Sequence, residues 1–420
     1  MYSKQVLKNG LTVLKVPIKG ARSVLVDLFV KVGSRQEKPR INGISHFLEH
    51  LFFKGSEKYP TAQELSHALD AIGAEYNANT GKEHTQYYIK AARKHLPFIF
   101  EVLTDMLQRP VFDAEEIERE KGVIIEEIKM YEDTPMRHVE DVLEEVMWPD
   151  QALGRNIAGT PEVIRKISKK DILDYVGTFY QPKNMILAVS GSFDEDILDK
   201  LIEIHWKGLK NHPYPAAVIA VEKQKTALVR VEKKKTEQMH LAIGFRSYDY
   251  NHPNYITQLI LGTILGGGMS SRLFIEIRER RGLAYYVKAS PSNYQDTGLF
   301  VIQAGVRSGS LLDSVKVILE EVRKIRDQVV PERELKKAKE YIKGTLTLSL
   351  EDSESLLGWY LEQIAFRHKT LEPDDAFHMI DKITAEDVQK VARDIFQEKK
   401  LNLAVVGQEK EDSLKKLLKL

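Results

Sequence analysis

The chain has 420 residues, of which 43% are hydrophobic and 29% charged, so it is too long for one hydrophobic core and contains enough apolar material for two or more. Lysine and arginine number 62 and aspartate and glutamate 61, a balance that gives no reason to expect a nucleic acid or an anionic membrane as partner. There is no cysteine, which excludes disulfide bonds, thiolate metal sites and a cysteine nucleophile. Any metal must therefore be held by His, Asp or Glu.

The N-terminal third of the chain predicts strands followed by a helix. The first ten residues lack the apolar core of a signal peptide, and no later apolar run is long enough to span a bilayer, so we expect a cytoplasmic protein. Residues 11–32 are rich in β-branched side chains with partial alternation, which is typical of strands. The helical segment that follows ends near Gly55, a plausible C-cap, and contains His46-Phe-Leu-Glu-His50.

This pentapeptide is a candidate metal site. At 3.6 residues per turn, His46, Glu49 and His50 fall within about 100° of arc on one helix. Two imidazoles four residues apart can hold one ion, and the carboxylate beside them can act on a water molecule; the order is H-x-x-E-H. The alternative is a partly exposed helix that happens to carry these side chains. With 12 histidines in the chain, a chance match is on the order of a few in a hundred, so the motif needs a third ligand.

A second helical segment, from Glu115 to Ile128, contains many carboxylates that can complete such a site. A catalytic zinc usually has three protein ligands and one position for water. Glu120 and Glu127 are seven residues apart, about two helical turns, and share one stripe of the helix. Most glutamates in a run of this kind form a solvated face, so spacing alone does not choose the ligand.

The chain contains an internal repeat at an offset of a little over two hundred residues. Residues 167–176 and 184–191 match residues 383–392 and 402–407, each pair being a capped helix followed by a buried strand that ends at glycine. Residues 11–32 likewise match residues 227–245. We predict the α+β class, with two homologous α+β domains that each contain an antiparallel sheet packed by helices. They span residues 1–210 and 226–420, and the linker at 211–225 contains Asn211-His-Pro-Tyr-Pro.

The repeat separates residues that the fold needs from residues that chemistry needs, because only the former are expected in both copies. Alignment of residues 44–50 with 256–262 replaces the motif by apolar or uncharged residues, and the second acidic helix changes in the same way. Opposite His46, Glu49, His50, Glu120 and Glu127 stand Gln258, Leu261, Gly262, Ala338 and Thr345. We therefore expect the second domain to keep the fold and to lack the metal site.

On these motifs the chain resembles the pitrilysin-like zinc metallopeptidases, also called the M16 or inverzincin family. In the family pattern 76 residues separate H-x-x-E-H from a ligand glutamate, which is Glu127 here, and Glu120 matches the family's second glutamate, which supports the site from an outer shell. The likeness covers nearly the whole chain, and in length the chain is similar to the beta subunit of mitochondrial processing peptidase and its bacterial homologues. It implies one Zn2+ per chain on His46, His50 and Glu127, with Glu49 as the general base.

The resemblance also implies contacts with substrate. Asn77 begins the segment Asn-Ala-Asn-Thr, which is similar to the strand where family members add a substrate backbone as an extra strand. A polar turn at the end of a strand is the other interpretation. Arg278 and Tyr285 match a family pair near the scissile bond, in which Tyr285 polarises the carbonyl and Arg278 holds Tyr285 or the peptide. Arg280 and Arg281 leave the choice of arginine open.

The function that the resemblance implies is a zinc-dependent endopeptidase that hydrolyses peptides or unfolded segments inside a closed chamber. Because family chambers contain four homologous domains and this chain supplies two, we expect a homodimer, or else a heterodimer with a homologous chain. No nucleic acid or membrane partner is expected. Two other classes remain: an assembly protein of the same fold, which usually lacks the ligands or the base, and a metal-dependent peptide-binding chaperone, which only an activity assay separates from a slow protease.

Overall fold

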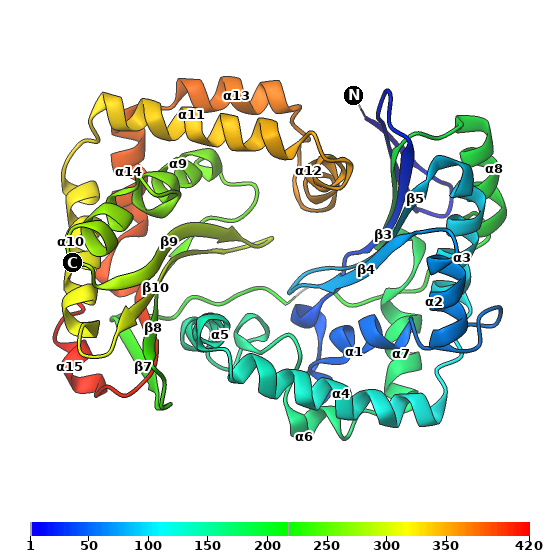
Figure 1. The fold of residues 1–420 in the computed structure, drawn as a ribbon, viewed down its shortest axis with the longest axis horizontal. Helices are drawn as coiled ribbons and strands as arrows, with labels where there is room; N and C mark the ends of the chain where they lie inside the picture. The colour runs from blue at the N-terminus through cyan, green and yellow to red at the C-terminus, as the bar shows by residue number, and fades with distance from the viewer. Residues whose placement is uncertain (1, 217) are drawn as a thin grey trace. The chain divides into compact units, whose positions relative to one another are not determined.

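The computed structural model describes residues 2–216 and 218–420, and contacts divide the chain into two compact units (Figure 1). Unit 1 contains Met1–Lys129, Arg155–Val218 and Ser349–Ala365, and unit 2 contains Met130–Gly154, Ile219–Leu348 and Phe366–Leu420. The central change between them, after Val218, falls in the segment expected to be a linker. In addition, each unit includes one segment from the other half of the chain, and the sequence repeat did not predict this exchange.

Unit 1 is built on a six-stranded sheet with the order β1-β2-β6-β3-β5-β4. Its central strands are apolar and strongly buried, since β-branched and other hydrophobic residues alternate between the two faces. All pairs are antiparallel except β2–β6, which is parallel. The strands are β1 (Ser3–Val6), β2 (Thr12–Pro17), β3 (Ser23–Val30), β4 (Glu75–Thr80), β5 (Thr85–Ala92) and β6 (Met185–Gly191).

Helices cover one face of this sheet and form the larger core of unit 1. Val24, Val26, Leu28 and Val30 of β3 point into it, and Figure 1 shows α2 and α3 beside β3, β4 and β5. The helices contributed by the N-terminal half are α1 (Ile44–Leu51), α2 (Ala62–Asp70), α3 (Leu96–Gln108), α4 (Ala114–Glu132), α6 (Pro161–Ile164), α7 (Lys169–Phe179) and α8 (Glu195–Trp206).

The opposite face of the sheet is covered by α12 (Ser353–Phe366), which comes from the C-terminal half of the chain. The Ser190 hydroxyl on β6 donates a hydrogen bond of 3.2 Å to the Ser353 carbonyl. Burial, and secondly the neighbouring Glu354 carboxylate, raise the pKa of Asp27 on β3 well above its usual value. The sheet of unit 1 is therefore enclosed on both faces only when α12 is present.

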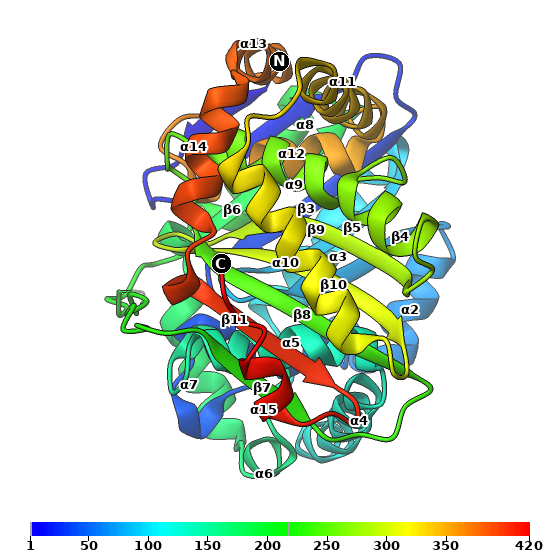
Figure 2. The ribbon, with the colours of Figure 1, turned by 90° about the vertical axis from the view of Figure 1, so that its left-hand side faces the viewer.

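Unit 2 repeats this plan on a five-stranded sheet with the order β7-β11-β8-β10-β9. Only the pair β7–β11 is parallel. Figure 2 shows α10 and α14 crossing one face of the sheet. The strands are β7 (Leu228–Glu232), β8 (Gln238–Ser247), β9 (Ala284–Asn293), β10 (Gly298–Arg307) and β11 (Leu401–Val406). The helices contributed by the C-terminal half are α9 (Tyr255–Gly266), α10 (Leu311–Asp327), α11 (Glu332–Ser349), α13 (Pro373–Lys382), α14 (Ala385–Ile395) and α15 (Glu411–Lys415).

The other face of this second sheet is packed by α5 (Pro135–Met147), which comes from the N-terminal half. Val139, Leu143 and Met147 of α5 form a separate buried cluster with Ala242 of β8 and Val301 of β10. α5 therefore has the role in unit 2 that α12 has in unit 1.

The predicted α+β class, with two similar domains of helices packed on sheets, is confirmed. Each sheet contains one parallel pair beside the predicted antiparallel ones. In each unit the last strand, β6 or β11, returns after several helices and pairs with an early strand in the same direction. Among the helices of the described residues, none combines the length and the apolar character that a membrane span requires.

Candidate metal centre

Two helices of unit 1 supply the candidate ligands, and their apolar residues fix which faces are available. On α1, Ile44, Phe47, Leu48 and Leu51 are buried in the core, which leaves the histidine face directed away from it. On α4, Ile117, Ile124 and Ile128 are buried in the same core. Packing therefore fixes the orientation of each helix about its own axis, so the polar residues on the remaining faces have defined positions.

His46, His50 and Glu127 lie together. One ligand atom from each lies within 4.8 Å of the other two, and this is the only group of three potential metal ligands of that kind among the described residues. Glu127 Oε2 is 3.3 Å from His50 Nε2 and 3.6 Å from His46 Nε2. Ligands about 2.1 Å from a tetrahedral zinc are separated by about 3.4 Å, so the two distances from Glu127 match those of one such ion.

The two histidines have different electrostatic surroundings. Burial, and secondly the neighbouring His50, lower the pKa of His46 to about 4. Burial also acts to lower the pKa of His50, but contacts with Glu120 and Glu127 outweigh it and raise the pKa to about 9. His46 is therefore ready to donate its Nε2 lone pair at neutral pH, whereas a metal must displace a proton from His50.

Glu120 supports His50 from behind. Its Oε2 lies 3.1 Å from His50 Nδ1 and its Oε1 lies 2.8 Å from the ammonium of Lys54, while only 3% of its side chain is exposed. Burial acts to raise the pKa of Glu120, but the hydrogen bonds from His50 and Lys54 lower it below its usual value. An ionised Glu120 fixes the His50 ring with Nε2 directed toward Glu127.

Glu49 lies beside this cluster without belonging to the group of three. Burial raises its pKa, and the adjacent Thr80 and His50 partly oppose that rise. The Thr80 hydroxyl, although next to the carboxylate, has no well-aligned hydrogen-bond partner among the described residues. A carboxylate whose pKa is raised accepts a proton more readily than an ordinary surface carboxylate, and this one lies beside the three potential metal ligands.

The corresponding positions of unit 2 carry no such chemistry. Gln258 is completely buried in α9, and Leu261 and Ala338 belong to the apolar core. The Thr345 hydroxyl hydrogen-bonds to a carbonyl of its own helix, that of Tyr341, at 2.9 Å. Unit 2 thus has the same helices, but most of the residues at the ligand positions are buried in its core.

Comparison with family models settles the relationship. The model described as "Insulinase (Peptidase family M16)" matches residues 13–161, and the model described as "Peptidase M16 inactive domain" matches residues 166–342. Together these matches cover more than half of the chain. The chain belongs to peptidase family M16. Family membership makes it a metallopeptidase, as predicted, and the matched description "inactive domain" agrees with the loss of the ligands in the second half.

Individual relatives agree with this assignment to M16. An uncharacterized zinc protease of Bacillus subtilis is 35% identical over 401 residues, which are 95% of this chain and 96% of the relative. The beta subunit of mitochondrial-processing peptidase from Bos taurus is 30% identical over 410 residues, which are 96% of this chain and 83% of the relative. Among solved structures, a protease from Helicobacter pylori superposes with a TM-score of 0.90 at 25% identity, covering 97% of this chain and 100% of that one.

The remaining predicted site residues of this M16 chain are not part of the cluster. Asn77 lies on β4, at the edge of the sheet of unit 1, with its side-chain oxygen accepting a hydrogen bond of 2.9 Å from the Ala78 amide. Arg278 lies in the π-helix Phe274–Glu279 of unit 2 and contacts the ring of Phe274. Tyr285, at the start of β9, is 54% exposed. Their contacts with substrate stay predictions.

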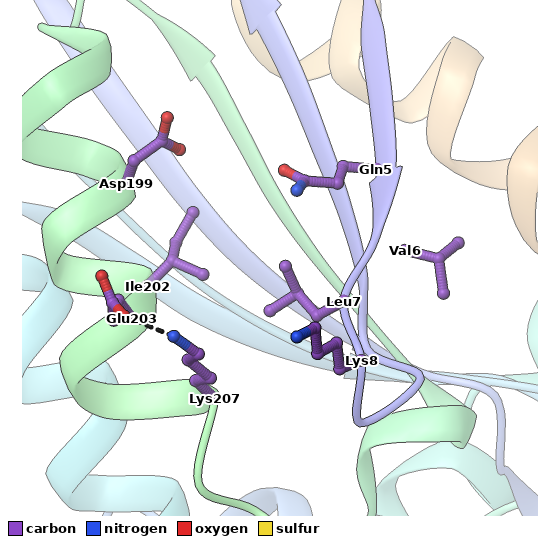
Figure 3. Close-up of a pocket in the computed structure, with 8 residues that line it drawn as sticks. All are labelled: Gln5, Val6, Leu7, Lys8, Asp199, Ile202, Glu203 and Lys207. Atoms are coloured by element: carbon purple, nitrogen blue, oxygen red, sulfur yellow. Dashed lines mark hydrogen bonds and ion pairs between the residues drawn. The ribbon is translucent and has the colours of Figure 1, made fainter.

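Unit 1 of this M16 chain also contains a cavity of about 410 Å³ between the β1 segment and α8. Figure 3 shows the ion pair of Glu203 and Lys207 on the α8 side of it. The residues that line the cavity are Gln5, Val6, Leu7, Lys8, Asp199, Ile202, Glu203 and Lys207. None of them is one of the three potential metal ligands, so the cavity is separate from the candidate metal site.

Sequence reasoning missed Lys54 and Thr80. Lys54 lies just beyond the end of α1, four residues after His50, and this short distance in sequence from a ligand was the available signal. Thr80 ends the segment Asn77-Ala-Asn-Thr, but nothing local indicates that β4 places it beside Glu49. That proximity depends on the packing of α1 against β4.

Lys54→Met is expected to weaken zinc binding by about tenfold, because Glu120 would remain buried without its cationic partner and would hold His50 less firmly. Zinc affinity can be measured by competition with a chromophoric chelator. Lys58→Met is the matched control, since Lys58 pairs with Glu101 in unit 1 and contacts none of the cluster. Equal affinities in the two variants would contradict this role of Lys54.

Proposed function

We propose that this M16 chain is a zinc-dependent endopeptidase in which His46, His50 and Glu127 hold the metal and Glu49 is the general base. The observation that carries the proposal is the separation of 3.3 and 3.6 Å between the Glu127 oxygen and the two imidazole nitrogens, which matches the edge of a tetrahedral zinc site. Zinc is chosen because the relatives are named zinc proteases and because the donors are two imidazoles and a carboxylate, a set that occurs in catalytic zinc sites.

The chemistry of the proposal is hydrolysis of a peptide bond. Zinc, when bound, supplies Lewis acidity that lowers the pKa of a water molecule and polarises the scissile carbonyl. Glu49 accepts a proton from the attacking water and later gives a proton to the leaving amine. Its raised pKa favours this second role, since a carboxylic acid whose pKa is closer to neutral can hold a proton between the two steps.

The edge of the sheet supports a peptide as substrate. β4 pairs with β5 on one side only, and its other backbone edge has no strand partner among the described residues. α1, which carries Glu49, packs against this strand. An extended peptide added to β4 would gain backbone hydrogen bonds that are independent of its sequence. Extended segments of unfolded chains are therefore the proposed substrates, and Asn77 is a proposed contact.

The proposal includes one zinc per chain and a homodimer. The resemblance to chambered M16 peptidases implies four homologous domains around the substrate, and this chain supplies two units of one fold. A homologous partner chain is the alternative to a second copy. The molecular mass of the purified protein in solution, measured by light scattering, distinguishes a monomer from either dimer, and mass spectrometry then identifies the partner.

Metal removal tests the proposed function. The purified protein is expected to contain close to one zinc per chain and to cleave an unfolded peptide. A chelator should abolish cleavage, and stoichiometric zinc should restore it, since the ligands are preformed by packing of α1 and α4. Elemental analysis and chromatography of the cleaved peptide provide the measurements. A protein that binds zinc but leaves every peptide intact would favour a binding protein over a peptidase.

A further inference from the structure

The helix that carries the two histidines has no N-cap of its own. α1 begins after Gly43, which has φ of 99° and no side chain to accept the first amides of the helix. A Cβ at this position would lie 2.6 Å from the Ala158 carbonyl oxygen, so a capping Ser, Thr or Asp does not fit there. The first-turn amides of a helix nevertheless need acceptors, and a buried unpaired amide destabilises the end of the helix.

Glu37, in the loop before α1, supplies these acceptors. Its Oε2 accepts hydrogen bonds from the Gly43 amide at 2.7 Å and from the Asn42 side chain at 2.8 Å. Its Oε1 accepts a hydrogen bond from the Ser45 amide at 2.8 Å. The residue is 3% exposed, and burial raises its pKa to about 7 although the hydrogen bonds from Asn42, Ser45 and Gly43 oppose the rise. The hydrogen bonds from Asn42, Gly43 and Ser45 therefore offset part of the cost of burying this carboxylate.

Glu37 is itself held firmly. The Arg155 guanidinium donates a hydrogen bond of 2.6 Å to the Glu37 carbonyl. Two residues earlier, the Arg35 amide donates to the Lys82 carbonyl at 2.8 Å, and the Arg35 side chain forms a buried ion pair of 2.5 Å with Glu83. The loop before α1 is thus fixed to the turn between β4 and β5. Through its hydrogen bonds to Gly43 and Ser45, Glu37 fixes the start of the helix relative to this loop.

From this geometry we infer that Glu37 is a positioning residue for the metal centre, which holds the first turn of α1 so that His46 is presented in register with His50. The inference rests on the proposed zinc site. α1 has only eight residues, and His46 directly follows Ser45, whose amide is bound by Glu37. Loss of this cap frays the turn that carries His46, whereas His50 stays held in the last turn by Glu120. The two ligands would then no longer share one fixed spacing.

The test compares Glu37→Gln with native protein and with a matched control. Asp105→Asn is the control because Asp105 is also a buried carboxylate of unit 1 that accepts a backbone hydrogen bond, from Lys58, and contacts no residue of α1. Zinc affinity of the full-length chain is measured by competition with a chromophoric chelator. Amide hydrogen exchange is measured for residues 43–47 without metal. Thermal unfolding of all proteins shows how much stability each change removes.

We expect Glu37→Gln to weaken zinc binding by about tenfold to a hundredfold, the range found for outer partners of metal ligands, and to speed exchange at residues 43–47. Asp105→Asn should lower the unfolding temperature but change zinc affinity less than about twofold, since His46 and His50 keep their positions. Glu37→Gln with native zinc affinity overturns the inference, and so does an affinity loss that Asp105→Asn reproduces at equal loss of stability.

A second variant covers the case in which Glu37→Gln does not fold. Asn42→Ala removes one donor to the Glu37 carboxylate and leaves the carboxylate in place. It is expected to weaken zinc binding by about threefold or more, and unchanged affinity overturns the inference. Failure of the proposed function gives a different result, because native protein would then bind no zinc with useful affinity, whereas failure of this inference alone leaves native binding intact.

Discussion

Glu49→Gln should retain zinc and the native fold while peptide hydrolysis falls by at least about a hundredfold, and by more if proton transfer limits the reaction. Glutamine has nearly the same shape as glutamate but cannot accept the proton of the attacking water. The side chain lies outside the group of three ligands, so removal of its charge leaves the metal donors in place. Turnover of an unfolded peptide and zinc content are measured on the same preparation.

The matched control for this variant is Glu126→Gln. The Glu126 side chain is 73% exposed on α4 and pairs with Lys129. The Glu126→Gln variant should therefore have native activity and native zinc content. If Glu49→Gln hydrolyses peptides at the native rate, another group accepts the proton and the proposed mechanism is wrong.

Alanine at His46, His50 or Glu127 should reduce zinc affinity by more than about a hundredfold, because replacement of an outer partner alone commonly costs about tenfold to a hundredfold. Each substitution removes one of the three donors and leaves too few protein ligands for a catalytic zinc site. Elemental analysis after exhaustive buffer exchange gives the zinc content, and thermal unfolding shows that the variants are folded.

Glu126→Ala provides the contrast within the same helix turn. It precedes Glu127 by one residue and so points about 100° away from it around the helix axis, toward solvent. We expect it to keep one zinc per chain. If Glu126→Ala loses the metal and Glu127→Ala keeps it, the assignment of the carboxylate ligand is wrong.

The cluster of ligands followed from sequence because helical geometry is local. His46, Glu49 and His50 share a helix face by spacing alone. The internal repeat replaces both Glu120 and Glu127, and the resemblance to the M16 family then selected Glu127. The role inferred for Glu37 did not follow, since it depends on a loop that returns to the start of α1 and on a glycine that leaves no room for a side chain. Such tertiary capping has no periodic signal.

The partners of α5 and α12 were also beyond the sequence. The apolar stripe on α5 predicts that the helix buries one face, but the stripe does not say which sheet receives it. Val139, Leu143 and Met147 pack in unit 2 although the chain around them otherwise builds unit 1. A duplicated sequence leads to the expectation that each copy folds from its own helices, and here one helix of each copy is given to the other unit.

This exchange has a consequence for synthesis on the ribosome. When residue 218 has been made, unit 1 still lacks Ser349–Ala365, and translation must proceed to residue 365, a further 147 residues (365 − 218), before α12 exists. At roughly 5–20 residues per second this takes about 7–30 s. During that time the sheet face that contains Asp27 is uncovered. The apolar face of α5 lacks its complete set of partners for even longer, until β11 has been synthesised. The nascent chain therefore presents two incompletely covered apolar surfaces at once. Chaperones that shield such surfaces are expected to bind it while residues 218 to 365 are being translated.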